Sequence, residues 1–319
     1  GGTITGEFDT YNAPTNFRIR LLNDGSIASL RFAPVSYTLM ARTQNQFNVA
    51  AALDSFIPAT AGDALTVSTA LDELTESAYP LAFEQVMPYF HEIVSEILLD
   101  QSFHQTEFFQ NRLSLLRSMH EGANSTPGKS GWIAWTQTHL DSMRSSAFDA
   151  TLAYENERDG FRVGADYHSG SNLRVGVFAG RNFDDVNYAP GSSMNSDSSQ
   201  FGAYGSLNDE SGLFIDAIVS AGTFDVDTRR RIAFSTIDRA AFADIEGFQF
   251  NAAVSVGRDF KFGDFTFGPH AGLELSQVEI DGFVESGADS LNLGLDDQKV
   301  RQLYSDIGMH LNYRMELSK

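Results

Sequence analysis

The stretch that decides the fold is residues 265–277, with the sequence FTFGPHAGLELSQ. Its apolar side chains, at Phe265, Phe267, Ala271, Leu273 and Leu275, fall at alternate positions, and the positions between them are small or polar. A β-strand places alternate side chains on opposite faces. The stretch therefore predicts a strand with one apolar and one polar face. The open question is whether protein or lipid covers the apolar face.

The same alternation recurs in residues 173–181, 248–256 and 303–317. In the second of these, Phe248, Phe250 and Val254 alternate with polar side chains that include Asn251 and Ser255. A soluble antiparallel sandwich also alternates, with its polar face in water. Alternation alone therefore leaves a soluble sandwich and a membrane barrel both open.

Strand length and turn pattern favour the membrane barrel. The predicted strands are 131–138, 160–167, 173–183, 199–207, 213–226, 248–260, 265–280 and 302–317. Most exceed the roughly five or six residues of soluble strands, and a tilted membrane strand needs about 9–11. Short turns at 168–172, 208–212 and 261–264 alternate with predicted long loops at 184–198, 227–247 and 281–300. This pattern is typical of outer-membrane barrels and places the short turns in the periplasm.

Composition narrows the functional classes. The chain of 319 residues has no cysteine and a net charge of −20. It can form no disulfide, and its acidity disfavours nucleic acid as a partner. Frequent glycine and phenylalanine, 27 and 26 residues, favour sheet over helical bundle. No run of 18 apolar residues is present, so a transmembrane helix is not expected. Because the chain begins at Gly1 without methionine, we expect a fragment or a processed product.

The pattern of the chain predicts four segments. Residues 1–43 are expected to be β, with a hairpin signal at Asp24-Gly25. Residues 44–100 have helical apolar spacing, with a kink or helix start at Pro88, and residues 101–129 continue as an amphipathic helix. Residues 130–319 are expected to form about eight strands.

The order of these segments resembles the C-terminal region of a type V autotransporter. The matching pieces are NQFNVAAALD at 45–54, RLSLLR at 112–117, and the hairpin from GFRVGADY at 160–167 to LRVGVFAG at 173–180. The resemblance implies a mainly β fold: an antiparallel, up-and-down transmembrane β-barrel of twelve strands in the bacterial outer membrane. A helix in its lumen would lead to a passenger at the cell surface. Residues 1–43 would be the end of that passenger, and 101–121 would supply the helix.

The resemblance also implies partners: outer-membrane lipid, the barrel-assembly machinery, periplasmic chaperones and the chain's own passenger. Members of the family end on a strand with a terminal aromatic residue, whereas this chain ends in MELSK. An eight-stranded barrel is filled by its own side chains and leaves no room for a helix. We therefore expect further strands to follow Lys319.

The alternation assigns side chains to the two sides of the barrel wall. The residues expected to face lipid are Phe248, Phe250, Val254, Phe265, Phe267, Leu273, Leu275, Ile307, Met309 and Leu311. The residues expected to face the lumen are Asn251, Ser255, His270, Glu274, Asp306 and His310. The polar positions expected on the luminal helix include Glu107, Asn111, Arg112 and Arg117.

No motif supports catalysis by this chain. The segment GANSTPGKSG at 122–131 has five residues between its first two glycines, where a phosphate-binding loop has four. In HEIVSE at 91–96, Ser95 occupies the place of the second zinc-ligating histidine, and we expect a solvated helix face there. Self-cleavage at Asn111 is not expected, because the paired-asparagine motif of self-cleaving autotransporters is missing. We expect no enzyme activity, cofactor or metal.

Two alternatives remain open at this point. The chain could be a soluble or surface-displayed β-sandwich that binds a ligand, or its passenger, upstream of Gly1, could carry an enzyme.

Overall fold

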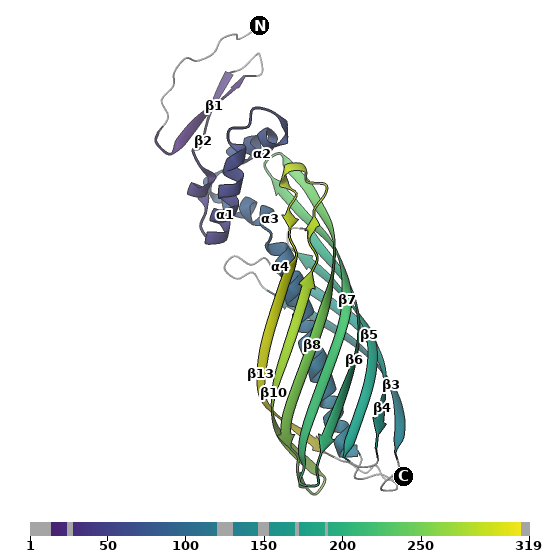
Figure 1. The fold of residues 1–319 in the computed structure, drawn as a ribbon. Coiled ribbons are helices and arrows are strands. Elements are labelled where there is room, and N and C mark those ends of the chain that lie inside the picture. The colour runs from purple at the N-terminus through teal and green to yellow at the C-terminus, as the bar shows by residue number, and fades with distance from the viewer. Residues whose placement is uncertain are drawn as a thin grey trace.

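The computed structural model describes residues 14–23, 28–119, 130–145, 153–169, 172–188 and 191–313. Its largest part is a nine-stranded antiparallel sheet that curves around a long helix (Figure 1). The strands pair in the order β13-β10-β8-β7-β6-β5-β4-β3, with short β9 paired to β10. Consecutive long strands of this meander are neighbours, which confirms the predicted up-and-down arrangement. In the described residues, β3 and β13 form the two edges of the sheet.

The strands are longer than predicted. Their bounds are β3 Gly131–Ser145, β4 Tyr154–His168, β5 Leu173–Tyr188, β6 Ser192–Asn208, β7 Leu213–Phe234, β8 Ile237–Arg258, β9 Phe260–Phe262, β10 Phe265–Ile280 and β13 Gln298–Tyr313. We call the end of the sheet with the turn at residues 209–212 the lower end, and the opposite end the upper end.

The long loops predicted at 184–198 and 227–247 are wrong. Strands β5 and β6 run through most of the first segment, and β7 and β8 run through nearly all of the second. Both segments contain many polar residues, but their apolar side chains still alternate, and they pack inward instead of outward. Val186 and Ile245, for example, are buried beneath the sheet, whereas Asp227 and Asp244 are exposed and lie opposite each other in the strand register. The third predicted loop contains only β11 (Phe283–Val284), a 3-10 turn (Asp289–Leu291) and β12 (Gly294–Leu295) before β13 begins.

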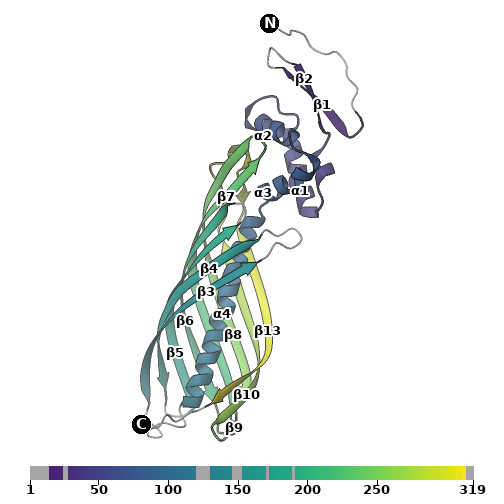
Figure 2. The ribbon, with the colours of Figure 1, turned by 180° about the vertical axis from the view of Figure 1, so that it is seen from behind.

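The N-terminal part forms a hairpin and a small helical layer. Strands β1 (Phe17–Asn23) and β2 (Ala28–Pro34) pair antiparallel, as the predicted hairpin requires, and its Asp24-Gly25 signal lies outside the described residues. Helices α1 (Gln44–Leu53), α2 (Gly62–Asp72) and α3 (Tyr79–Val86) follow, joined by 3-10 turns at Asp54–Phe56 and Glu76–Ala78 and preceded by one at Tyr37–Met40. We refer to these helices as the cap, because they pack against the upper end of the sheet (Figures 1 and 2).

The cap and the sheet share one apolar core. Leu71 and Phe83 from the cap are fully buried in a cluster that also contains Ile232 and Phe234 of β7 and Ile237 of β8. The β7–β8 hairpin projects beyond the neighbouring strands and supplies this surface (Figure 1). The upper part of the hairpin is therefore the surface on which the cap packs.

Helix α4 (Tyr89–Met119) lies along the concave face of the sheet, and the open side between β3 and β13 exposes it in Figure 2. It begins directly after Pro88, which lacks the N–H that a helix interior needs. With 31 residues it is about 46 Å long. The predicted boundary between a linker ending at 100 and a separate helix from 101 is therefore wrong, because one helix crosses it. Residues 120–129, with most of the 122–131 glycine motif, lie outside the described residues.

Among the described helices, none combines the length and the apolar character that crossing a membrane requires.

The side chains on the two faces of the sheet change in polarity along its length. On β7 the outward side chains are Leu213, Ile215, Ala217 and Val219 in the lower half, and Asp225, Asp227 and Arg229 in the upper half. The inward face is mixed in its lower half, where Asp216 and Ser220 alternate with Phe214 and Ile218, and it carries Phe224 and Val226 further up. The apolar outer part, residues 213–221, has the length of about nine residues that a tilted strand needs to cross the hydrocarbon layer.

Aromatic pairs lie at the lower edge of the apolar outer face. Trp132 on β3 packs on Tyr167 of β4 with 5.2 Å between ring centroids, and Phe265 on β10 packs on Tyr313 of β13 at 4.6 Å. Aromatic rings at this depth are typical of the girdles of outer-membrane barrels. In the described part of the chain no second sheet covers the apolar outer face. This arrangement decides against the soluble sandwich.

Candidate functional site

The residues expected to face lipid share the outer face of β8, β10 and β13. Most are exposed, and Ile307 is the most open at 93% exposure. Phe250 and Phe267 are half-buried between neighbouring outward side chains. In the strand register Leu273 lies beside Val254, and Leu275 lies beside Leu303, so the outward residues form one continuous apolar surface.

The residues expected to face the lumen share the concave face. Asn251, Ser255 and Glu274 are buried there, and Asn251 donates to Glu274 at 2.6 Å. Nearer the lower end, His310 contacts Asp259 at 2.8 Å and His270 lies 3.4 Å from Asp306. The structure therefore brings all six residues to the face along which α4 runs.

The lower third of α4 is held by arginines. Arg117 donates from Nη1 to both Asp216 carboxylate oxygens, at 2.6 and 2.7 Å, and from Nε to Asp259 at 3.2 Å. Its guanidinium also lies 3.7 Å from the centre of the Phe214 ring. Arg112 pairs with Asp166. Because these groups are buried together, each charge compensates another that has lost its water.

Aromatic packing surrounds these ion pairs. Phe109 of α4 lies 4.3 Å from Phe178 and 4.5 Å from Tyr204, measured between ring centroids. Tyr204 reaches this position by lying over Gly176 of the next strand, where an added Cβ would overlap its ring. The concave face thus combines charged clamps with an apolar contact for the helix.

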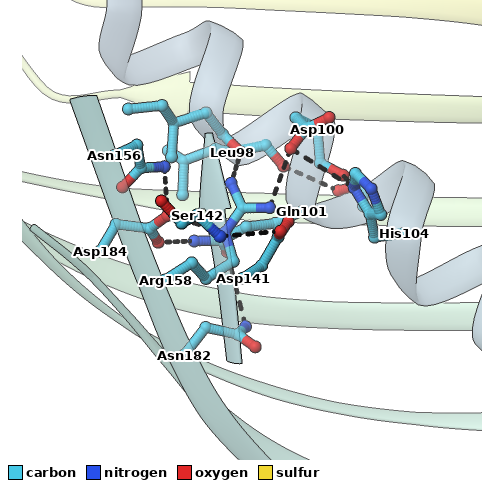
Figure 3. A network of polar contacts seen from close by, with 12 residues as sticks. Leu98, Asp100, Gln101, His104, Asp141, Ser142, Asn156, Arg158, Asn182 and Asp184 are labelled. Carbon is cyan, nitrogen blue, oxygen red and sulfur yellow. Dashed lines mark hydrogen bonds and ion pairs between the residues drawn. The ribbon is translucent and has the colours of Figure 1, made fainter. Parts of the chain in front are cut away.

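A polar network, shown in Figure 3, holds the middle of α4. Arg158 on β4 donates to Asp184 on β5 at 2.7 Å and to Asp100 on the helix at 2.8 Å. Gln101 donates to the second carboxylate oxygen of Asp184 at 2.5 Å, and Asn156 donates to the first at 2.9 Å. Two strands and the helix therefore share one buried carboxylate, which fixes the rotation of α4 at this level.

The upper third of α4 packs on an apolar wall and ends at a second ionic cluster. Ile93 and Ile97 contact the inward side chains of the upper strands. His91 Nε2 lies 2.9 Å from Glu285, and Arg230 on β7 donates to the same carboxylate at 2.9 and 2.5 Å. Burial raises the pKa of Glu285, but the hydrogen bonds from Arg230 and His91 outweigh this effect and hold the pKa at about 2.

His91 corrects the expectation for the 91–96 segment. Glu92 and Glu96 are exposed, as on a solvated helix face, but His91 is buried against Glu285. The reason is that the first turn of α4 lies beneath the loop at 281–297, a contact of residues almost two hundred positions apart in the chain.

The four polar helix positions expected from the sequence divide into two pairs. Arg112 and Arg117 point to the sheet and form the ion pairs described above. Glu107 and Asn111 are exposed and face away from the described strands. The structure therefore brings only the two arginines into the polar clusters of the concave face.

Sequence analysis missed most partners of α4. Asp166, Asp184, Asp216, Arg158 and Arg230 all lie on inward positions of their strands. The available signal was a charged residue on the parity opposite to the apolar one, as at Asp216 between Ile215 and Ala217. The helix residue that each of these charged side chains contacts is far away in the sequence, so the local pattern does not identify it.

The fold and the helix-lined face can now be compared with known proteins. No curated protein sequence matches the chain. Among solved structures, the translocator domain of the autotransporter NalP from Neisseria meningitidis matches with 14% identity and a TM-score of 0.52, over 68% of this chain and 71% of that one. The β-domain of the Bordetella autotransporter BrkA matches with 17% identity and a TM-score of 0.25, over 58% of this chain and 94% of that one.

The family evidence comes from the sequence itself. Residues 132–319, more than half of the chain, match the family described as the autotransporter β-domain. The matched region begins one residue into β3 and so contains all strands of the curved sheet. The chain therefore belongs to the autotransporter β-domain family, and it is a translocator domain of the bacterial outer membrane.

Proposed function

We propose that this chain helps export its own N-terminal passenger and then anchors it in the outer membrane. One observation supports the proposal above the others: α4 is bound along the concave face from its first turn to its last described turns. The helix connects the lower end of the sheet with the cap at the upper end (Figure 1). A chain exported through the interior and stopped there would leave this helix in place.

The outer face supports the anchoring role. Its lower half presents a continuous apolar band, which hydrocarbon stabilises, whereas the upper half presents carboxylates that need water. In hydrocarbon, the backbone N–H and C=O groups must form their hydrogen bonds within the sheet. Each long strand between β3 and β13 has a hydrogen-bonded neighbour on both sides and so meets this requirement. Outer-membrane lipid is therefore the first partner of this surface.

The proposal assigns no catalytic step and no cofactor to this chain. Its further partners would be its own passenger, and during assembly the periplasmic chaperones and the barrel-assembly machinery, which membership of the family suggests. Residues up to 43 would end the passenger, and the cap would lie outside the membrane.

The orientation can be tested by labelling single cysteines, because the chain has none of its own. Glu76→Cys lies in the cap and Glu210→Cys in the turn at the lower end, and both native side chains are exposed. In intact cells, a maleimide that cannot cross the outer membrane should label Glu76→Cys only. After the outer membrane is permeabilised, Glu210→Cys should react as well. Labelling of Glu210→Cys alone in intact cells, or of neither variant, would contradict the proposal.

A further inference from the structure

The upper end of the sheet contains a binding site for a short segment of the same chain. The segment is residues 85–91, from the end of α3 to the first turn of α4. The main-chain oxygen of Gln85 accepts from Arg230 at 2.6 Å, and its side-chain oxygen accepts from the Ala233 N–H at 2.5 Å. At the other end of the segment His91 contacts Glu285 at 2.9 Å. Two residues six positions apart therefore bind two different elements of the upper sheet.

Arg230 and Glu285 also form contacts that do not involve the segment. Arg230 and Glu285 form a two-point ion pair, and both residues are almost fully buried, at 2% and 3% exposure. Glu285 also accepts from the Leu293 N–H at 2.7 Å, and Arg230 donates to the Leu291 oxygen at 2.9 Å. These bonds join β7 to the loop at 281–297 and fix the direction of the remaining donor and acceptor groups.

The contacts that Arg230 and Glu285 make with the segment can form only when residues 85–91 lie at this one position along the sheet. Arg230 Nη1 donates to the Gln85 oxygen, and a buried charged donor without an acceptor costs free energy. Phe83, two residues before Gln85, is fully buried with Ile232 and Phe234. Movement of the chain by one helical turn would remove Gln85, His91 and Phe83 from their contacts together.

We propose that Arg230 and Glu285 form a stop site that arrests the exported chain with residues 85–91 at the upper end of the sheet, and so sets the position of α4 in the interior. This inference rests on the proposed export function. Arg230 and Glu285 act as positioning residues: they bind the segment and fix how far the chain has moved. The alternative is that the ion pair between Arg117 and Asp216, near the lower end of the sheet, sets the position of α4 instead.

Cross-linking measures the position of α4 directly. Ser114 of α4 lies 3.0 Å from Asn312 of β13 between side-chain atoms, so Ser114→Cys with Asn312→Cys reports the native position. Ser118→Cys with Asn312→Cys reports a helix that has moved about one turn further toward the upper end. Each pair is unambiguous in a chain without native cysteine.

The test variant is Gln85→Ala with His91→Ala, which removes the bond from the Ala233 N–H to the Gln85 side chain and the contact of His91 with Glu285. It keeps the bond from Arg230 to the main-chain oxygen of residue 85 and leaves the Arg230–Glu285 pair in place. The matched control is Gln44→Ala, the same residue type at an exposed position outside α4. Both are made in the whole chain in the outer membrane. We expect the ratio of the 118–312 to the 114–312 cross-link to rise about tenfold in the test variant, equivalent to about 1.4 kcal/mol. The control should keep the native ratio.

An unchanged ratio in Gln85→Ala with His91→Ala, and also in Arg230→Met, which removes the donor to the main-chain oxygen of Gln85, would overturn the stop site. An unchanged ratio there together with a raised ratio in Arg117→Met would assign the position of α4 to the interior instead. Display of the N-terminus is measured on the same cells. If export itself is the wrong function, the N-terminus of the unaltered chain is not displayed. If only the stop site is wrong, the N-terminus is displayed and the cross-link ratio of the test variant stays at the native value.

Discussion

Arg117 illustrates how single charged side chains hold α4. It is buried, it contacts two aspartates, and its guanidinium lies over an aromatic ring. A buried charge is stable only while its partners remain, because removal of one partner leaves the other without compensation. The contacts of Arg117 therefore matter more to stability than those of a surface arginine.

Replacing Arg117 with methionine should destabilise the protein by about 3–5 kcal/mol, because Asp216 and Asp259 would lose their cation. The control is Arg144→Met, which removes an exposed pair with Glu155 and should cost at most about 1 kcal/mol. Urea unfolding of both variants in lipid vesicles measures the difference. Equal losses in the two variants would show that Arg117 is not buried among its partners.

Leu273 tests the outer face at the same scale. It is 52% exposed and points away from α4 in the apolar band. Leu273→Arg should cost about 2–4 kcal/mol if the residue lies at mid-bilayer, because an arginine there must leave water. Asn195→Arg, on the polar upper part of the outer face, should change stability little. Folding titrations in vesicles compare them, and a cost near zero for Leu273→Arg would argue against lipid contact.

At the scale of elements, the β7–β8 hairpin explains both a failure and a success of sequence analysis. Its lower half was predictable, because apolar residues such as Ile215 and Val254 alternate with polar ones. Its upper half, residues 227–247, was predicted as a loop and contains acidic residues such as Asp227 and Asp244. The alternation continues there with the apolar side chains inward, which an analysis that seeks apolar residues on one fixed parity does not detect.

The loop at 281–297 should respond to acid. The pKa of Glu285 is held at about 2 in the folded protein, below the ordinary value of 4.5. A carboxyl with a lowered pKa stabilises the fold fully above its unfolded pKa, and this contribution is lost as the pH falls from about 4.5 through about 2. Hydrogen exchange of the loop amides should therefore quicken over this range, relative to the amides of β7.

Glu285→Gln is the control for the acid response. It cannot ionise, so its loop should exchange faster already at neutral pH and should show no further change between pH 4.5 and 2. A loop in the unaltered chain that is equally protected at pH 2 and pH 7 would contradict the role given to Glu285.

At the scale of the molecule, two solvents explain the arrangement. Lipid favours apolar side chains on the lower outer face, and the helix-filled interior opposite needs polar groups. Water favours the carboxylates on the upper outer face, and the apolar side chains opposite pack on the cap and the first turns of α4. The alternation in residues 265–277 was enough to predict the first half of this arrangement.

The rest could not be predicted from local patterns. The pairing of Arg117 with Asp216 joins residues 99 positions apart, and that of His91 with Glu285 joins residues 194 positions apart. Sequence analysis identified Arg117 as a polar helix position and could not identify its partner. The position of α4 along the sheet is a property of the assembled molecule.

The most direct test of the account uses the two tryptophans of the chain, both on β3. Trp132 points outward and is 69% exposed, whereas Trp135 points inward and contacts Phe108 and Phe109 of α4. The measurement is fluorescence quenching by lipids brominated on their acyl chains, with Trp135→Phe and Trp132→Phe each leaving one tryptophan. The account predicts strong quenching of Trp132 and weak quenching of Trp135. Equal quenching of the two, or stronger quenching of Trp135, would contradict it.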